Sequence, residues 1–122
     1  MTLQESGEMY LETILILSMQ SDKVRSIDIS RHMGFSKPSV SRAVNLLNSQ
    51  KYISVAPDGA ITLTKTGHEI AEKIYERHEV LTKCLILLGV NETAAAEDAC
   101  RIEHVISDST FNAIKAKIKN QK

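Results

Sequence analysis

Apolar residues near the start of the chain recur with the spacing of helices that bury one face. In residues 8–20, Tyr10 and Ile14 belong to a set of apolar positions spaced i, i+4 and i+7, which predicts a first helix. A short second helix is predicted over residues 27–32, with Ser26 as its N-cap.

A tight turn and a third helix are predicted next. Gly34 ends the second helix, and Ser36 is a favourable N-cap for the third. Pro38 falls in the first helical turn, where its missing N–H has no effect on the hydrogen bonds. This helix should run to about residue 50. Its inward stripe is Val40, Ala43, Val44 and Leu47.

The pattern then changes to β-type runs and returns to helices. Residues 52–55 and 60–63 flank the turn Ala56-Pro57-Asp58-Gly59, which predicts a β-hairpin. Three helices are predicted after it, over residues 65–88, 92–106 and 108–119, with Gly89 closing the first of them. The expected fold class is mainly α with a small β-hairpin.

Composition adds constraints on the core and the setting. Apolar residues make up 43% of the 122 residues and aromatic residues 4%, so aliphatic side chains must build the core. No apolar run is long enough to span a bilayer, and no secretory leader is recognisable, so a cytoplasmic location is expected. Cys84 and Cys100 are then expected to be thiols. Cys84, among apolar residues at helical spacing, is interpreted as part of the core.

The net charge of zero conceals an uneven distribution. Residues 21–65 carry seven basic and three acidic side chains, a net +4, and the rest carries eight basic and twelve acidic ones, a net −4. A basic module beside an acidic one can bind phosphates locally while the whole chain stays neutral.

A short helix, a glycine turn, a second helix and a hairpin follow one another in the order of a winged helix-turn-helix. The third helix begins with short hydroxyl donors and basic side chains, which suit phosphates and base edges. The predicted DNA-binding residues are Ser36, Lys37, Pro38, Ser39, Arg42 and Lys51. The alternative is a small domain that uses the same geometry to dock a protein.

A second candidate site lies in the C-terminal half. Cys100, Glu103 and His104 are spaced i, i+3 and i+4, so a helix would bring a thiolate, a carboxylate and an imidazole to one face. These donors suit a divalent transition metal. Taken alone, the spacing is equally compatible with a buried cysteine beside a surface glutamate and histidine.

Two segments of the chain resemble a known family. Residues 8–14 (EMYLETI) and 97–108 (EDACRIEHVISD) are similar to the signature segments of the diphtheria toxin repressor family of iron- and manganese-dependent transcriptional regulators. The segments Lys65-Thr66-Gly67 and Arg77-His78 also resemble that family. The resemblance implies a winged helix-turn-helix DNA-binding domain at 1–64, a helical metal-binding and dimerisation domain at 65–122, and a short form that lacks the SH3-like domain of some members.

The resemblance also implies a set of metal ligands. Met9, Cys100, Glu103 and His104 match the pattern of the iron regulators, His78 matches a position used by both branches, and Glu12 matches a carboxylate of the manganese branch. The predicted set is therefore a hybrid: Met9, Glu12, His78, Cys100, Glu103 and His104. The acid and histidine of the iron branch's ancillary site are replaced by Thr82 and Ala96, which puts a copy of that site in doubt.

The softness of the donors indicates which metals to expect. Thioether and thiolate ligands favour Fe²⁺, Co²⁺, Ni²⁺ or Zn²⁺ over Mn²⁺. Availability in the cell matters as well, so Fe²⁺ is the expected corepressor, Mn²⁺ is second, and Zn²⁺, Co²⁺ and Ni²⁺ should substitute in vitro.

The expected partners are a second copy of the chain and a palindromic operator in double-stranded DNA, and the resemblance implies metal-homeostasis genes as targets. Small and apolar residues motivate the homodimer, namely the run from Ala94 to Ala99 and the stripe Phe111, Ile114 and Ile118. Phosphate loops, nucleophile elbows and paired catalytic carboxylates are missing from the sequence, so no enzyme is expected. Two rival classes remain. One is an enzyme that uses a metal held by Cys100, Glu103 and His104 as a Lewis acid, which would need an open coordination site in a substrate cleft. The other is a winged-helix regulator that binds no metal, or a protein-docking module.

Overall fold

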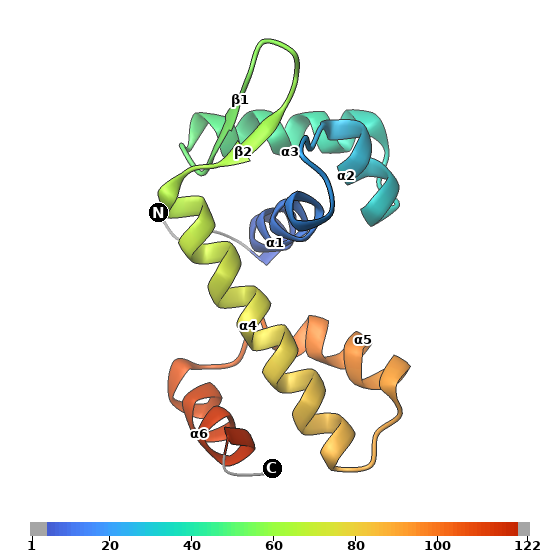
Figure 1. The fold of residues 1–122 in the computed structure, drawn as a ribbon, viewed down its shortest axis with the longest axis vertical. Helices are drawn as coiled ribbons and strands as arrows, with labels where there is room; N and C mark the ends of the chain where they lie inside the picture. Colours follow the sequence, from blue (N-terminus) through green and yellow to red (C-terminus); the bar gives the residue numbers. More distant parts are fainter. Residues whose placement is uncertain (1–4, 120–122) are drawn as a thin grey trace. The chain divides into compact units, whose positions relative to one another are not determined.

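The computed structural model describes residues 5–119, and within them it contains six helices and one two-stranded hairpin (Figure 1). The expected fold class is confirmed. The elements in chain order are α1 (Glu5–Gln20), α2 (Ser26–Met33), α3 (Lys37–Ser49), β1 (Ile53–Val55), β2 (Ile61–Leu63), α4 (Lys65–Leu87), α5 (Glu92–Ile102) and α6 (Asp108–Lys119).

The chain divides into two compact units, one up to Glu72 and one from Lys73, so α4 contributes to both. The domain boundary expected between residues 64 and 65 stays a prediction. No described helix is both long and apolar enough to cross a membrane.

In the first unit, α1 supplies much of the core. It contacts α2, α3 and β2, and Leu11 and Ile14 are buried along it, as the helical spacing predicts. Gly34 follows α2 with a φ of +73°, a left-handed conformation that ends helices at little cost for glycine. α3 then turns Val40 and Leu47 into the core. The helix-turn-helix is therefore held by apolar side chains from three helices.

The hairpin packs onto the same core through one residue of each strand. β1 and β2 are antiparallel, with Ile53 opposite Leu63 and Val55 opposite Ile61. Ile53 and Ile61 are buried, and the N–H of Ile61 donates to the carbonyl of Val24 at 2.7 Å. This bond joins β2 to the segment between α1 and α2.

In the second unit, each of the three helices contributes buried side chains. Ala95 and Ala99 on α5 are fully buried, while Leu81 on α4 and Phe111 on α6 are nearly so. Gly89, at a φ of +103°, follows the end of α4 as predicted. Of the small residues of α5, Ala95 and Ala99 thus belong to the interior of this unit, whereas Ala94 and Ala96 are half-buried.

Two predicted helix limits are wrong. Ser26 is the first residue of α2 and not its N-cap; Arg25 holds the cap position, and its backbone N–H donates to the Asp28 carboxylate at 2.9 Å. The helix predicted over residues 92–106 ends at Ile102, and a turn occupies the following four residues. The chain leaves the helix there because Ser107 caps α6, with its hydroxyl accepting the N–H of Thr110 at 3.1 Å.

Candidate functional site

The predicted DNA-binding residues lie at the start of α3, along it and just beyond its end. All are exposed except Ser39, which is half-buried: Ser36, Lys37, Pro38, Ser39, Arg42 and Lys51. Ser36 is the N-cap of α3, as predicted, because its hydroxyl accepts the N–H of Ser39 at 3.3 Å. Exposure makes these side chains available to a duplex, and contact with DNA stays a prediction.

The polar side chains of this face are connected to one another. The Ser36 hydroxyl donates to the Ser39 hydroxyl at 2.9 Å, and Arg42 Nη2 donates to the same Ser39 hydroxyl at 3.4 Å. Burial raises the pKa of Tyr10 on α1, and the positive charge of Arg42 offsets part of that shift. Arg42 is therefore already oriented along the start of α3 before any phosphate is bound.

The tip of the hairpin has partners that the sequence did not reveal. Asp58 pairs with Lys23 at 3.1 Å, and its backbone carbonyl accepts a hydrogen bond from Arg25 Nε at 3.2 Å. The N–H of Ala60 and the Lys23 ammonium hold the pKa of Asp58 below its usual value. Two of the basic side chains counted toward DNA binding are therefore engaged in positioning the hairpin.

In the second unit, the candidate metal ligands gather around Glu103. This residue is the C-cap of α5, with φ −58° and ψ −24°, so it continues the helical path by one residue. The i, i+3 relation to Cys100 is thus preserved, whereas His104 lies in the turn and not on the helix. The shared helical face predicted for Cys100, Glu103 and His104 is therefore wrong for His104.

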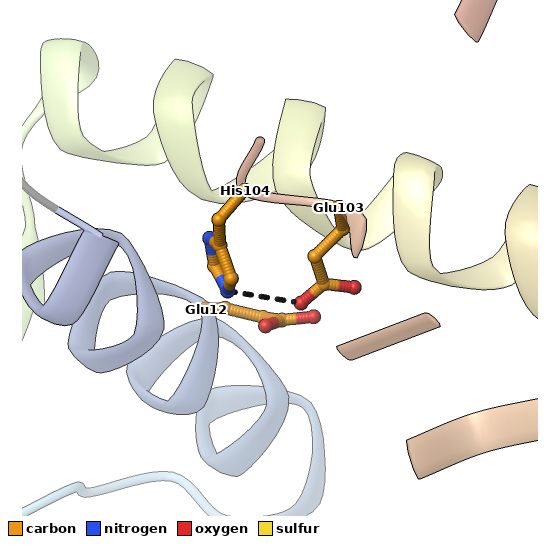
Figure 2. A group of neighbouring side chains, drawn as sticks. All are labelled: Glu12, Glu103 and His104. Carbon is orange, nitrogen blue, oxygen red and sulfur yellow. Dashed lines mark ion pairs between the residues drawn. The ribbon is translucent and has the colours of Figure 1, made fainter. Parts of the chain in front are cut away.

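Both carboxylate oxygens of Glu103 face imidazole nitrogens. His78 Nδ1 lies 2.9 Å from Oε2, and His104 Nε2 lies 3.3 Å from Oε1, the pair drawn in Figure 2. The side chains of Glu103 and His104 are 0% exposed, and that of His78 is 28% exposed. The fold thus brings together three of the six predicted ligands from α4 and the turn after α5.

The remaining predicted ligands are placed as follows. Cys100 is half-buried on α5, one helical turn before Glu103, and forms no disulfide. Met9 is half-buried and Glu12 buried on α1 (Glu12 is labelled in Figure 2), and a spacing of i, i+3 puts them on one face of that helix. Metal ligation by any of the six predicted residues stays a prediction.

The residues around Glu103 fit a divalent transition metal. Two imidazoles and a carboxylate are among the ligands such ions prefer, and a carboxylate that is withdrawn from water needs cationic or hydrogen-bonding partners. A copy of the family's ancillary site was in doubt because Thr82 stands in place of an acid. The buried hydroxyl of Thr82 has no hydrogen-bond partner among the described residues.

Arg77 is the residue that sequence reasoning overlooked. It is 6% exposed on α4 and donates from Nη1 to the backbone carbonyl of Glu103 at 3.1 Å. The only sequence signal was its place beside His78, in a dipeptide noted for its resemblance to the family. Helical spacing alone gives no indication of a partner 26 residues further along the chain.

Comparison with known proteins shows the family of the chain. Residues 2–61 match the family model of the iron-dependent repressor N-terminal DNA-binding domain, and residues 64–122 match the model of the iron-dependent repressor metal-binding and dimerisation domain. The transcriptional regulator MntR of Salmonella typhimurium is 32% identical over 107 residues, which are 88% of this chain and 68% of that protein. The chain belongs to the iron-dependent repressor family.

Other members of the iron-dependent repressor family show how far the similarity extends. The diphtheria toxin repressor of Corynebacterium diphtheriae is 28% identical over 97% of this chain and 53% of its own length. The solved manganese regulator SloR is 27% identical with a TM-score of 0.83, over all of this chain and 56% of SloR. This chain therefore spans about half the length of these two proteins. The family consists of metal-dependent transcriptional regulators, which bind DNA and dimerise.

Proposed function

We propose that this chain is a metal-dependent repressor of metal-homeostasis genes that acts in the cytoplasm as a homodimer on a palindromic operator. The observation that carries the proposal is the buried Glu103 carboxylate between His78 and His104, inside the segment that matches a metal-binding and dimerisation domain. A divalent cation would stabilise a carboxylate in this position. The proposal assigns no catalytic activity to the chain.

The proposed ligand set is Met9, Glu12, His78, Cys100, Glu103 and His104. Fe²⁺ is the proposed corepressor, because a thioether and a thiolate favour it over the harder Mn²⁺. Mn²⁺ is the second candidate, since SloR, at 27% identity, is named a manganese regulator, and a further neighbour at 28% identity is named a manganese-dependent repressor in complex with manganese. Zn²⁺, Co²⁺ and Ni²⁺ should substitute in vitro.

The test measures DNA binding under anaerobic conditions with Fe²⁺, with Mn²⁺ and with a chelator. Genomic fragments enriched by the metal-loaded protein provide the probe for fluorescence anisotropy. Tight DNA binding that requires Fe²⁺ supports the full proposal. DNA binding that occurs with Mn²⁺ and not with Fe²⁺ would identify Mn²⁺ as the corepressor in place of Fe²⁺. Equal affinity in metal and in chelator would favour a metal-independent regulator, and no DNA binding under any condition would favour a protein-docking module.

The proposed DNA-binding residues are Ser36, Lys37, Pro38, Ser39, Arg42 and Lys51, and two of them give a direct test. Lys37→Ala and Arg42→Ala should each weaken operator binding without altering the fold, because both cations are exposed along α3. Lys37→Ala should also reduce the slope of log affinity against log salt by about 1. Lys83→Ala, an exposed cation on α4, is the matched control. Unchanged affinity in both α3 variants would place the DNA-binding surface elsewhere.

A further inference from the structure

Arg77 makes contacts that neither DNA binding nor metal ligation explains. Its Nη1 donates to the backbone carbonyls of Glu103 at 3.1 Å and Ile106 at 2.8 Å, and its Nη2 donates to the carboxylate of Asp108. The centre of its guanidinium group lies 5.3 Å from the centroid of the Phe111 ring. One buried cation therefore contacts both ends of the turn after α5 and the start of α6.

The turn that Arg77 holds carries two of the proposed metal ligands. α5 ends at Ile102, and carbonyl groups at a helix C-terminus have no partner within the helix. The guanidinium supplies donors to Glu103 and Ile106 at this point. The N–H groups of Val105 and Ile106 also donate to the carbonyl of Ile102, both at 3.0 Å, and the N–H of Glu103 donates to the carbonyl of Ala99 at 2.9 Å. Without Arg77, the carbonyls at both ends of the turn would lose their charged donor.

Arg77 and His78, which are consecutive on α4, both contact Glu103. Arg77 holds the backbone carbonyl of Glu103, while His78 contacts its carboxylate at 2.9 Å. The planar guanidinium reaches three acceptors at once, which the single ammonium of a lysine matches poorly. Asp108, the third acceptor, also lies 3.2 Å from Lys73, so its charge is shared between two cations. Lys73 therefore pairs with the same carboxylate as Arg77, and among the described residues no hydrogen bond or ion pair joins Lys73 to residues 103–106.

We propose that Arg77 is a positioning residue for the metal site, which holds the turn of residues 103–106 so that Glu103 and His104 keep a ligating arrangement. This inference rests on the proposed function, in which both residues bind metal. Partners outside the ligand shell that orient ligands typically contribute about 10–100-fold to metal affinity. A residue that only stabilised the fold would leave the affinity and the ligand geometry of the folded protein unchanged.

The test compares Arg77→Met and Arg77→Lys with the control Lys73→Met in the full chain. Anaerobic titration with Co²⁺ gives affinity, and the visible absorption bands of bound Co²⁺ report the ligand geometry. Arg77→Met should weaken Co²⁺ binding by about 10–100-fold and change the bands, and Arg77→Lys should not restore either. Lys73→Met should stay close to wild type. In metal-free protein, the amides of Val105 and Ile106 should exchange faster in Arg77→Met than in Lys73→Met.

The outcomes separate the two proposals. If wild type binds no Co²⁺, the proposed function fails, and amide exchange alone decides whether Arg77 holds the turn. If wild type binds Co²⁺ and Arg77→Met keeps the wild-type Co²⁺ affinity and spectrum, the positioning role is overturned. It is also overturned if Arg77→Lys has the wild-type affinity and spectrum. Should Arg77→Met fail to fold by circular dichroism, Arg77→Lys and Asp108→Asn replace it. Wild-type Co²⁺ affinity in both of these folded variants would also overturn the inference.

Discussion

At the scale of single residues, Gly67 occupies a position where no side chain fits. It is buried near the start of α4, and a Cβ built on it would lie 2.0 Å from the backbone carbonyl oxygen of Tyr52. Gly67→Ala should therefore lower the free energy of unfolding by about 1–3 kcal/mol, because backbone must move to relieve the overlap. Urea denaturation measures the change, and Thr66→Ala, at an exposed neighbouring position, should stay within about 0.5 kcal/mol of wild type.

Lys51 is constrained in a different way. It has a φ of +67°, the left-handed region, which costs a residue with a Cβ about 1–2 kcal/mol. Lys51→Gly relieves this strain but adds backbone entropy to the unfolded chain, so we expect a net gain of up to about 1 kcal/mol in unfolding free energy. Lys51→Ala keeps the Cβ and should show no such gain. Equal thermal unfolding midpoints for Lys51→Gly and Lys51→Ala would contradict backbone strain at Lys51.

At the scale of elements, the start of α6 is joined to α4 by charge. The Lys73 ammonium, through a hydrogen bond and its charge, and then Arg77 hold the pKa of Asp108 below its usual value. A lowered pKa in the folded state means that Asp108 contributes stability above its unfolded value of 3.8, which is lost as the pH falls through the lower folded value. The junction between α4 and α6 should thus weaken in acid.

Comparison of wild type with Asp108→Asn measures this contribution. The variant should be less stable than wild type near neutral pH, and the difference should shrink as the pH falls below about 4. Lys73→Met should remove part of the same pH dependence, since Lys73 is the main cause of the shift. Urea denaturation at a series of pH values provides the data. A difference that does not vary between neutral and acidic pH would exclude the proposed ionic contribution.

At the scale of the whole molecule, the proposed ligands are drawn from both compact units, and this suggests how metal could control DNA binding. A metal that requires ligands on α1 as well as around Glu103 would bind best to the conformation that also binds DNA. By linkage, metal and DNA should then tighten each other by the same factor, typically about 5–150-fold. Titration of metal with and without DNA, and of DNA with and without metal, measures the two factors.

Variants at the ligands sharpen this prediction. His104→Ala should reduce metal-activated DNA binding more than Met9→Ala, because imidazole is a good ligand for every candidate metal. Neither variant should change the weak DNA binding that we expect in chelator. Cys84→Ala is the control: Cys84 lies on α4 in apolar surroundings with Ile114 and Ile118 and outside the proposed ligand set. Unequal coupling factors, or activation lost in Cys84→Ala, would contradict the scheme.

The sequence by itself determined most of the elements and the residue types of the candidate site. Apolar spacing located the helices, because a helix that buries one face must repeat every three or four residues. Ser36 and Gly34 marked helix limits because capping and left-handed turns are local chemistry. The turn Pro57-Asp58-Gly59 located the hairpin for the same reason. Cys100, Glu103 and His104 were predicted as a candidate site from their donor types together with their i, i+3 and i+4 spacing.

Only the tertiary structure decided how those donors are held. α5 ends four residues earlier than its pattern predicts, and Arg77, distant in sequence, binds the carbonyls of Glu103 and Ile106 in the turn that follows. His78 contacts Glu103 across 25 residues of sequence. Local periodicity contains no information about such distant pairs. These pairs form only when packing buries the charged groups away from water, because each buried group then needs the other as its partner.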